Sequence, residues 1–105
     1  MEIAINDAGS TATIKLKGRL DILGAETIDL PLATLSGSKD GILIDMAEVT
    51  FIASIGLRHL VSASKAVHRH GGQLVLLNPT EAVAEVIAAS GLTEFLPIRH
   101  GAASG

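Results

Sequence analysis

Ser54 is the side chain in this sequence with the clearest potential for chemistry, because its hydroxyl stands directly before an amphipathic stretch. A serine nucleophile on an α/β scaffold occupies a G-x-S-x-G turn and works with a histidine and an acid. The segment Ala53-Ser54-Ile55-Gly56 lacks that form, and its apolar neighbours supply no base. We therefore expect no catalytic residue and no enzymatic activity.

The histidines and glycines point to no metal or nucleotide site. His68 and His70 are two residues apart, which places them about 200° apart around a helix. His59 and His100 have no partner at metal-ligand spacing, and the chain has no cysteine. The glycines form neither a G-x-G-x-x-G motif nor a phosphate loop, so we expect no metal and no cofactor.

Two interpretations of Ser54 remain open from its position. As the N-cap of the following helix, its oxygen would accept a backbone N–H and contribute about 1 kcal/mol. Alternatively, the preceding strand ends near Asp45, and residues 46–53 cross the carboxyl end of the sheet as a loop. Open α/β folds place their working surface at that rim, and Ser54 would lie on it.

Strand patterns surround this segment. Residues 11–17 alternate between apolar and polar side chains, and residues 2–6 do so too across a turn, which predicts a hairpin at a sheet edge. The apolar runs at 42–45 and 74–77 predict central parallel strands that are covered on both faces. A short last strand is expected at 95–98.

Helical patterns lie between and after these strands. Residues 55–70 predict a helix that buries one stripe, exposes the opposite one, and stops at Gly71-Gly72; the buried set is Leu57, Leu60, Val61, Ser64 and Val67, and the exposed set is Arg58, Ser62, Lys65 and Arg69. A second helix is expected at about 80–90, capped by Thr80, with Val83, Val86, Ile87 and Ser90 facing inward. The segment 24–36 has helical spacing but contains Pro31, which predicts a kinked or late-starting helix.

Composition sets the protein class. Hydrophobic residues make up 48% of the 105 residues, and the formal net charge is -3. These values indicate one soluble α/β domain over residues 1–100, a flexible tail at 101–105, and, without a membrane span or leader pattern, a cytoplasmic location. The chain has two Phe and no Trp or Tyr, and this shortage of stacking rings together with the acidic balance argues against nucleic-acid binding.

Three segments resemble the STAS family, whose fold is shared by sulfate-transporter tails and bacterial anti-sigma factor antagonists. Gly18-Arg19-Leu20-Asp21 looks like its G-x-L-D signature. Residues 43–57 are similar to its strand, crossing loop and Asp-Ser-Ser/Thr-Gly-Leu segment, with Ser54 at the phosphorylatable serine. Residues 71–79 and the closing Ser90-Gly91-Leu92 match its glycine turn, fourth strand and last Gly-Leu. The resemblance implies a mixed, mostly parallel sheet of four to five strands packed by three to five helices.

The resemblance also implies a function. An antagonist of this kind binds an anti-sigma factor that is itself a serine-protein kinase, thereby frees a sigma factor, and is switched off when its serine is phosphorylated. The expected partners are this kinase and a phosphatase. The expected contact residues are Asp21 and the run from Ala53 to Arg58, which comprises Ala53, Ser54, Ile55, Gly56, Leu57 and Arg58.

Two positions depart from the family pattern. Ala53 stands where the family usually has Asp, and Ile55 where it has Ser or Thr. The missing carboxylate favours a second hypothesis, in which the domain is a cytoplasmic STAS subunit that docks on an ABC or anion transporter without phosphorylation. The full-length match to stand-alone antagonists favours the first hypothesis.

Overall fold

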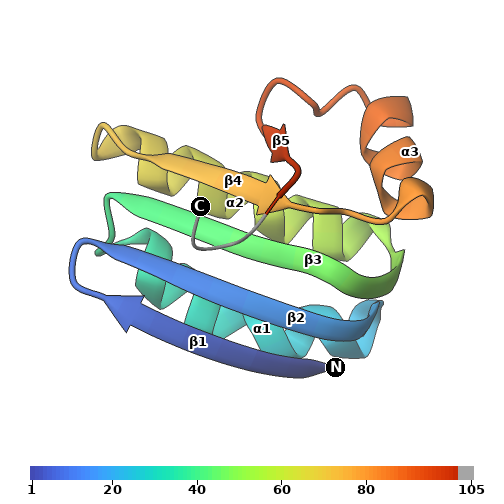
Figure 1. The fold of residues 1–105 in the computed structure, drawn as a ribbon, viewed down its shortest axis with the longest axis horizontal. Coiled ribbons are helices and arrows are strands. Elements are labelled where there is room, and N and C mark those ends of the chain that lie inside the picture. Colours follow the sequence, from blue (N-terminus) through green and yellow to red (C-terminus); the bar gives the residue numbers. More distant parts are fainter. Residues whose placement is uncertain (102–105) are drawn as a thin grey trace.

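A computed structural model describes residues 1–101 as one five-stranded sheet with three helices (Figure 1). In chain order the elements are β1 (Glu2–Ala8), β2 (Thr11–Leu20), α1 (Ile22–Ser36), β3 (Gly41–Ile52), α2 (Ser54–Arg69), β4 (Gln73–Leu77), α3 (Glu81–Ala89) and β5 (Ile98–Arg99). Apart from Gly101, the tail predicted at 101–105 lies outside the described residues.

The sheet has the strand order β1-β2-β3-β4-β5. β1 pairs antiparallel with β2, while the β2·β3, β3·β4 and β4·β5 pairs are all parallel. The predicted edge hairpin and the two central parallel strands are therefore confirmed. The last strand is shorter and later than predicted, since only Ile98 and Arg99 pair, with Leu76 and Leu77.

The helices α1 and α2 lie side by side against one face of the sheet, and α3 packs near one end of it (Figure 1). The core between sheet and helices includes Ile14, Ile44 and Leu60, each at most 1% exposed. The prediction that both central strands are covered on both faces holds for β4, where residues 74–77 are all buried. It is wrong for β3, because Leu43 and Asp45 on its second face are only half-buried.

The loop predicted at residues 46–53 is wrong for all but its last residue. Strand β3 continues to pair with β2 as far as Ile52, which pairs with Leu20. Two irregularities in the β2·β3 register each give β3 one extra residue. After the first one, the buried residues of β3 are Val49 and Ile52, three apart instead of two. A bulge changes the period of a strand, so residues 46–52 do not alternate in the sequence.

Helix α1 starts earlier than predicted. The Asp21 side chain accepts a hydrogen bond from the Gly24 backbone N–H at 2.9 Å and caps the helix, which then runs through Pro31 to Ser36. Proline removes one backbone hydrogen bond from a helix interior. The buried side chains of Ile28, Leu32 and Leu35 hold this helix on the core and offset that loss.

The other two helices follow their patterns more closely. α2 buries Leu57, Leu60 and Val67, half-buries Val61 and Ser64, and exposes the predicted polar stripe. α3 is capped by Thr80 as predicted and buries Val83 and Ile87. Val86 and Ser90 point outward, contrary to expectation, because this nine-residue helix packs near the sheet end through a narrow stripe only.

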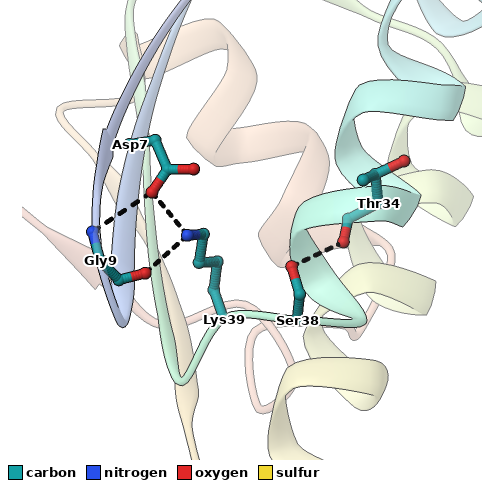
Figure 2. Close-up of polar contacts among 5 residues, drawn as sticks. All are labelled: Asp7, Gly9, Thr34, Ser38 and Lys39. Atoms are coloured by element: carbon teal, nitrogen blue, oxygen red, sulfur yellow. Dashed lines mark hydrogen bonds and ion pairs between the residues drawn. The ribbon is translucent and has the colours of Figure 1, made fainter.

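A polar cluster fastens the end of the molecule where β2 and β3 begin (Figure 2). The Lys39 ammonium donates to Asp7 Oδ1 and to the Gly9 carbonyl oxygen of the β1–β2 turn. Asp7 Oδ1 also accepts from the Gly9 N–H at 3.2 Å. The Lys39 side chain is only 12% exposed, while that of Asp7 is 55% exposed, so a largely covered lysine holds the hairpin turn to the segment before β3. We call Asp7, Gly9 and Lys39 the lysine clamp.

Candidate functional site

The carboxyl ends of β2 and β3 bring the first turns of α1 and α2 to one rim of the sheet (Figure 1). Leu20 pairs with Ile52, and the Ala53 N–H donates to the Leu20 carbonyl oxygen at 2.9 Å. Asp21 directly follows Leu20, and Ser54 directly follows Ala53. The structure thus brings together the two parts of the predicted site, which are 33 positions apart in sequence.

Two glycines allow this close approach. A Cβ on Gly24 would overlap the Arg19 carbonyl oxygen, and a Cβ on Gly56 would lie 2.6 Å from Leu20 Cγ. Both glycines are buried in the first turns of their helices. Each helix start therefore packs directly on the end of β2, which fixes where the rim side chains emerge.

Ser54 lies inside helix α2 and is not its N-cap, so the capping interpretation is wrong. Ala53 holds the cap position, where it makes no side-chain hydrogen bond, and its carbonyl oxygen accepts from the Leu57 N–H at 3.1 Å. Ser54 is the first helical residue and is exposed. The hydroxyl therefore stands in the first turn, among N–H groups that no side chain of the N-cap satisfies.

The other predicted contact residues divide by burial. Arg58 is exposed and Ile55 is half-buried, so both border the surface around Ser54. Gly56 and Leu57 are buried, with Leu57 in the core. These two residues position the rim from below, and their side chains are covered by the domain itself.

Three exposed apolar side chains lie where these elements begin or end, and the sequence analysis missed them. Ile22 is 68% exposed and Leu23 72% exposed in the first turn of α1, and Phe51 at the end of β3 is 39% exposed. Ile22 and Leu23 are adjacent in the chain, and neighbouring exposed apolar groups are typical of an interaction surface. The sequence signal that could have revealed Ile22 and Leu23 is that this apolar pair directly follows Asp21 and belongs to no predicted strand or helix.

Charged groups frame these apolar side chains. The Arg19 guanidinium lies 4.3 Å from the centroid of the Phe51 ring, and its Nε is 3.7 Å from Asp21 Oδ2. The hydrogen bond from the Gly24 N–H lowers the pKa of Asp21 below its ordinary value, and the Arg19 charge acts in the same direction. We use the name Ser54 rim for the half-buried Asp21 together with five exposed residues, Arg19, Ile22, Leu23, Phe51 and Ser54.

Nothing at the rim has the arrangement of a metal centre. In residues 1–101 no three His, Asp or Glu side chains are grouped so that they could hold a metal ion. Over the same residues, no helix has the length and apolar character needed to cross a membrane. What the rim offers is a hydroxyl, apolar side chains and a few charges, which are the means of binding a protein surface.

Comparison with known proteins shows a family. The STAS domain model matches residues 2–104. A protein described as "Probable septum site-determining protein MinC" from Ectopseudomonas mendocina is 29% identical over 103 residues, an alignment that covers 90% of this chain. The chain spans only 43% of the length of that relative.

Solved structures share the fold. The anti-sigma factor antagonist SpoIIAA in its unphosphorylated form superposes with a TM-score of 0.85 at 23% identity, over 98% of this chain and 90% of its own. An anti-sigma factor antagonist from Mycobacterium paratuberculosis gives 0.82 at 19% identity, over 98% of this chain and 87% of its own. The family match over nearly the whole chain, together with this shared fold, identifies the protein as a member of the STAS family.

Proposed function

We propose that this STAS domain is an anti-sigma factor antagonist that works by partner switching and is controlled by phosphorylation of Ser54. One observation carries the proposal: an exposed serine hydroxyl stands in the first turn of α2, on a rim with exposed apolar side chains. In this scheme the Ser54 rim binds an anti-sigma factor with serine-kinase activity in the cytoplasm. The domain itself acts as a regulatory binding module and not as an enzyme.

The first turn of α2 suits a phosphate. A helix N-terminus carries a partial positive charge and free N–H groups that bind anions. Because Ala53 supplies no side-chain cap, a phosphate on Ser54 would meet no competing oxygen at the N-cap. The domain would stay folded after phosphorylation.

The interface would not tolerate the same change. A phosphoserine brings about -1.5 to -2 charges at pH 7 into a surface that includes Ile22, Leu23 and Phe51. These charges would have to lose water on docking, which weakens the complex. A phosphatase would reverse the modification and restore binding. The similar protein SpoIIAA has been solved in unphosphorylated and phosphorylated forms, which supports a switch of this type.

The test measures binding to the serine-kinase anti-sigma factors encoded by the same genome, by pull-down and by calorimetry. Ser54→Asp is expected to weaken binding by about 2–5 kcal/mol, while Ser54→Ala keeps it. Ser62→Asp is the matched control, because Ser62 is also exposed on α2 but lies about 12 Å further along the helix. Asp suits a first turn, so Ser54→Asp should keep its unfolding temperature.

The outcomes separate the hypotheses. Loss of binding in Ser54→Asp alone supports the switch. If Ser54→Asp binds as the unmodified protein does, or if Ser62→Asp weakens binding equally, the switch hypothesis is wrong. Mass spectrometry adds a direct check, since incubation of the domain with the bound kinase and ATP should place phosphate on Ser54.

A second candidate function is favoured by Ala53, which stands where the STAS pattern usually has a carboxylate. In this alternative, the rim docks on the cytoplasmic face of an ABC or anion transporter and Ser54 is never phosphorylated. Folded Ser54→Ala and Ser54→Asp proteins that both lose binding would indicate a direct hydroxyl contact. Co-purification of the domain with a permease in that case would favour the transporter hypothesis.

A further inference from the structure

A cavity of about 570 Å³ opens between the second half of α2 and the segment before β5. This volume is in the range of about 300–1,000 Å³ that is typical of small-molecule sites. The cavity starts at Ser64, ten residues after Ser54 along α2, so it lies roughly 15 Å or more from that residue along the helix axis. The domain therefore has a candidate small-molecule site that is separate from the Ser54 rim.

Three basic side chains line one wall of this cavity: Lys65, His68 and Arg69. Their spacing of three and four residues puts them on one face of α2. Among residues 1–101, neither Lys65 nor Arg69 forms an ion pair, and Glu94 is the acid of the lining. Like charges four residues apart destabilise a helix, so these side chains are placed at a cost to folding.

The helix end explains only part of this cluster. Basic residues in the last turn complement the negative end of the helix dipole, and His68 and Arg69 occupy that turn in α2. Lys65 lies one turn earlier, where the dipole effect has faded. Its ammonium instead lies 5.1 Å from the centroid of the Phe95 ring, at the edge of the cavity.

The rest of the lining combines the polar residues Ser64, Gln73 and Glu94 with an apolar part. Leu74 of β4 is 2% exposed, and Phe95 and Pro97 on the opposite side are half-buried. An apolar surface below a set of cationic groups is complementary to a molecule with an apolar body and a negatively charged end.

The wall that carries Phe95 is fixed to the domain at three points. Ser64 Oγ donates to the Phe95 carbonyl oxygen at 2.5 Å, and the Leu76 N–H donates to the Pro97 carbonyl oxygen at 2.9 Å. Leu96 between them is fully buried in the core. The cavity therefore exists before any ligand arrives, and little ordering is needed on binding.

We propose that this cavity binds a small organic anion, in which a carboxylate, sulfonate or phosphate is attached to a flat apolar body. The charged end is held by Lys65 and Arg69, and the apolar body rests on Phe95 and Pro97, which lie beside the buried Leu74. This site is independent of phosphorylation at Ser54, so either proposal can fail without the other.

The test uses 2-naphthoate as probe and 2-naphthamide as its uncharged match, titrated into ¹⁵N-labelled protein. Naphthoate is expected to shift the backbone amide signals of Gly72, Gln73 and Phe95. Lys65→Gln and Arg69→Gln should each weaken its binding about tenfold, the effect of one hydrogen bond to a charged group. Lys17→Gln is the control, because it removes one positive charge from an exposed side chain of β2, which does not line the cavity.

Each result decides the proposal. Preference for naphthoate over naphthamide, lost in the α2 variants and kept in Lys17→Gln, supports the site. Equal binding of the two probes means an apolar groove without anion selectivity and overturns it. Absence of shifts at the cavity overturns it as well, and so does equal weakening in Lys17→Gln, which indicates an effect of net charge alone.

Discussion

The two ends of the sheet differ in how far their surface groups are satisfied by contacts within the domain. At the lysine clamp, a side chain that is 12% exposed ties the β1–β2 turn to the segment before β3 through Asp7 and Gly9 (Figure 2). At the Ser54 rim, the N-cap of α2 makes no side-chain hydrogen bond, and Ile22 and Leu23 are each more than two-thirds exposed. One end is closed by its own polar contacts, and the other leaves binding groups open.

This difference separates stability from recognition. Groups that are satisfied inside the domain contribute to its folding, whereas exposed apolar groups contribute free energy only when a partner covers them. We therefore expect substitutions near the clamp to change the free energy of unfolding. Substitutions of the exposed apolar side chains at the rim should change affinity and leave unfolding nearly unchanged.

The largest effect is expected for Gly72→Ala at the clamp end, before β4. A Cβ on Gly72 would overlap the Asp40 backbone carbonyl oxygen, which accepts a hydrogen bond from the Gln73 N–H. The backbone must shift, so we expect a loss of about 3 kcal/mol in urea unfolding. Gly71→Ala is the neighbouring control: its Cβ meets open space, and only its φ of 78° costs about 1–2 kcal/mol. A smaller loss for Gly72→Ala than for Gly71→Ala would contradict the packing argument.

At the rim, Leu23→Ser is expected to weaken partner binding by about 2 kcal/mol, or roughly thirtyfold, as for the loss of an apolar anchor. Its unfolding free energy should change by less than about 0.5 kcal/mol, because the side chain is 72% exposed. Leu30→Ser is matched to it, since Leu30 is 76% exposed on the same face of α1 about two turns further on. Calorimetry should show full affinity for Leu30→Ser. Equal losses in the two variants would mean that the partner covers the whole of α1.

The sequence was sufficient to predict most of the fold because most elements bury one regular stripe. The alternation at 11–17 became β2, and the stripe of α2 was correct at Leu57, Leu60 and Val67. The second half of β3 could not be predicted, because its two bulges replace the period of two that identifies a strand. Helix α1 starts early because Asp21 caps it. The sequence pattern did not show this start, because Pro31 within the segment favoured a kinked or late-starting helix.

The candidate site was predictable only in its chain positions. The spacing correctly placed Ser54 at a helix start but assigned it the N-cap position, which Ala53 occupies. The backbone conformation of Ala53 sets that position, although alanine has no side chain that can cap. The apolar part of the rim was missed for a different reason. Whether Ile22 and Leu23 are covered depends on how α1 packs against β2 and α2, and that is a property of the tertiary structure.

Adding a cap to α2 should strengthen the weak point of the rim. Ala53→Asp would place a carboxylate where it can accept from the free N–H groups of the first turn, with an expected gain of about 1 kcal/mol. Ala53→Asn supplies the same cap without charge and should gain a similar amount. Thermal unfolding checks both variants, and Thr80→Ala at the start of α3 should show the opposite sign, a loss of about 1 kcal/mol. A gain for Asp without one for Asn would indicate a charge effect instead of a capping effect.

The smallest effect, a dependence on pH, should be present at both ends. The Lys39 hydrogen bond lowers the pKa of Asp7 at the clamp, and the Gly24 N–H lowers that of Asp21 at the rim. A carboxyl with a lowered folded-state pKa binds its proton less readily when folded than when unfolded, so its stabilisation is complete above the ordinary aspartate pKa. That stabilisation is lost as the pH falls through the lowered value.

Carboxyl ¹³C titration should show both residues titrating below the ordinary aspartate range. Lys39→Met should return Asp7 towards that range and leave Asp21 unchanged, because the two groups lie at opposite ends of β2. A parallel change at Asp21 would mean that the clamp also stabilises the rim, and the separation of the two ends would then be wrong.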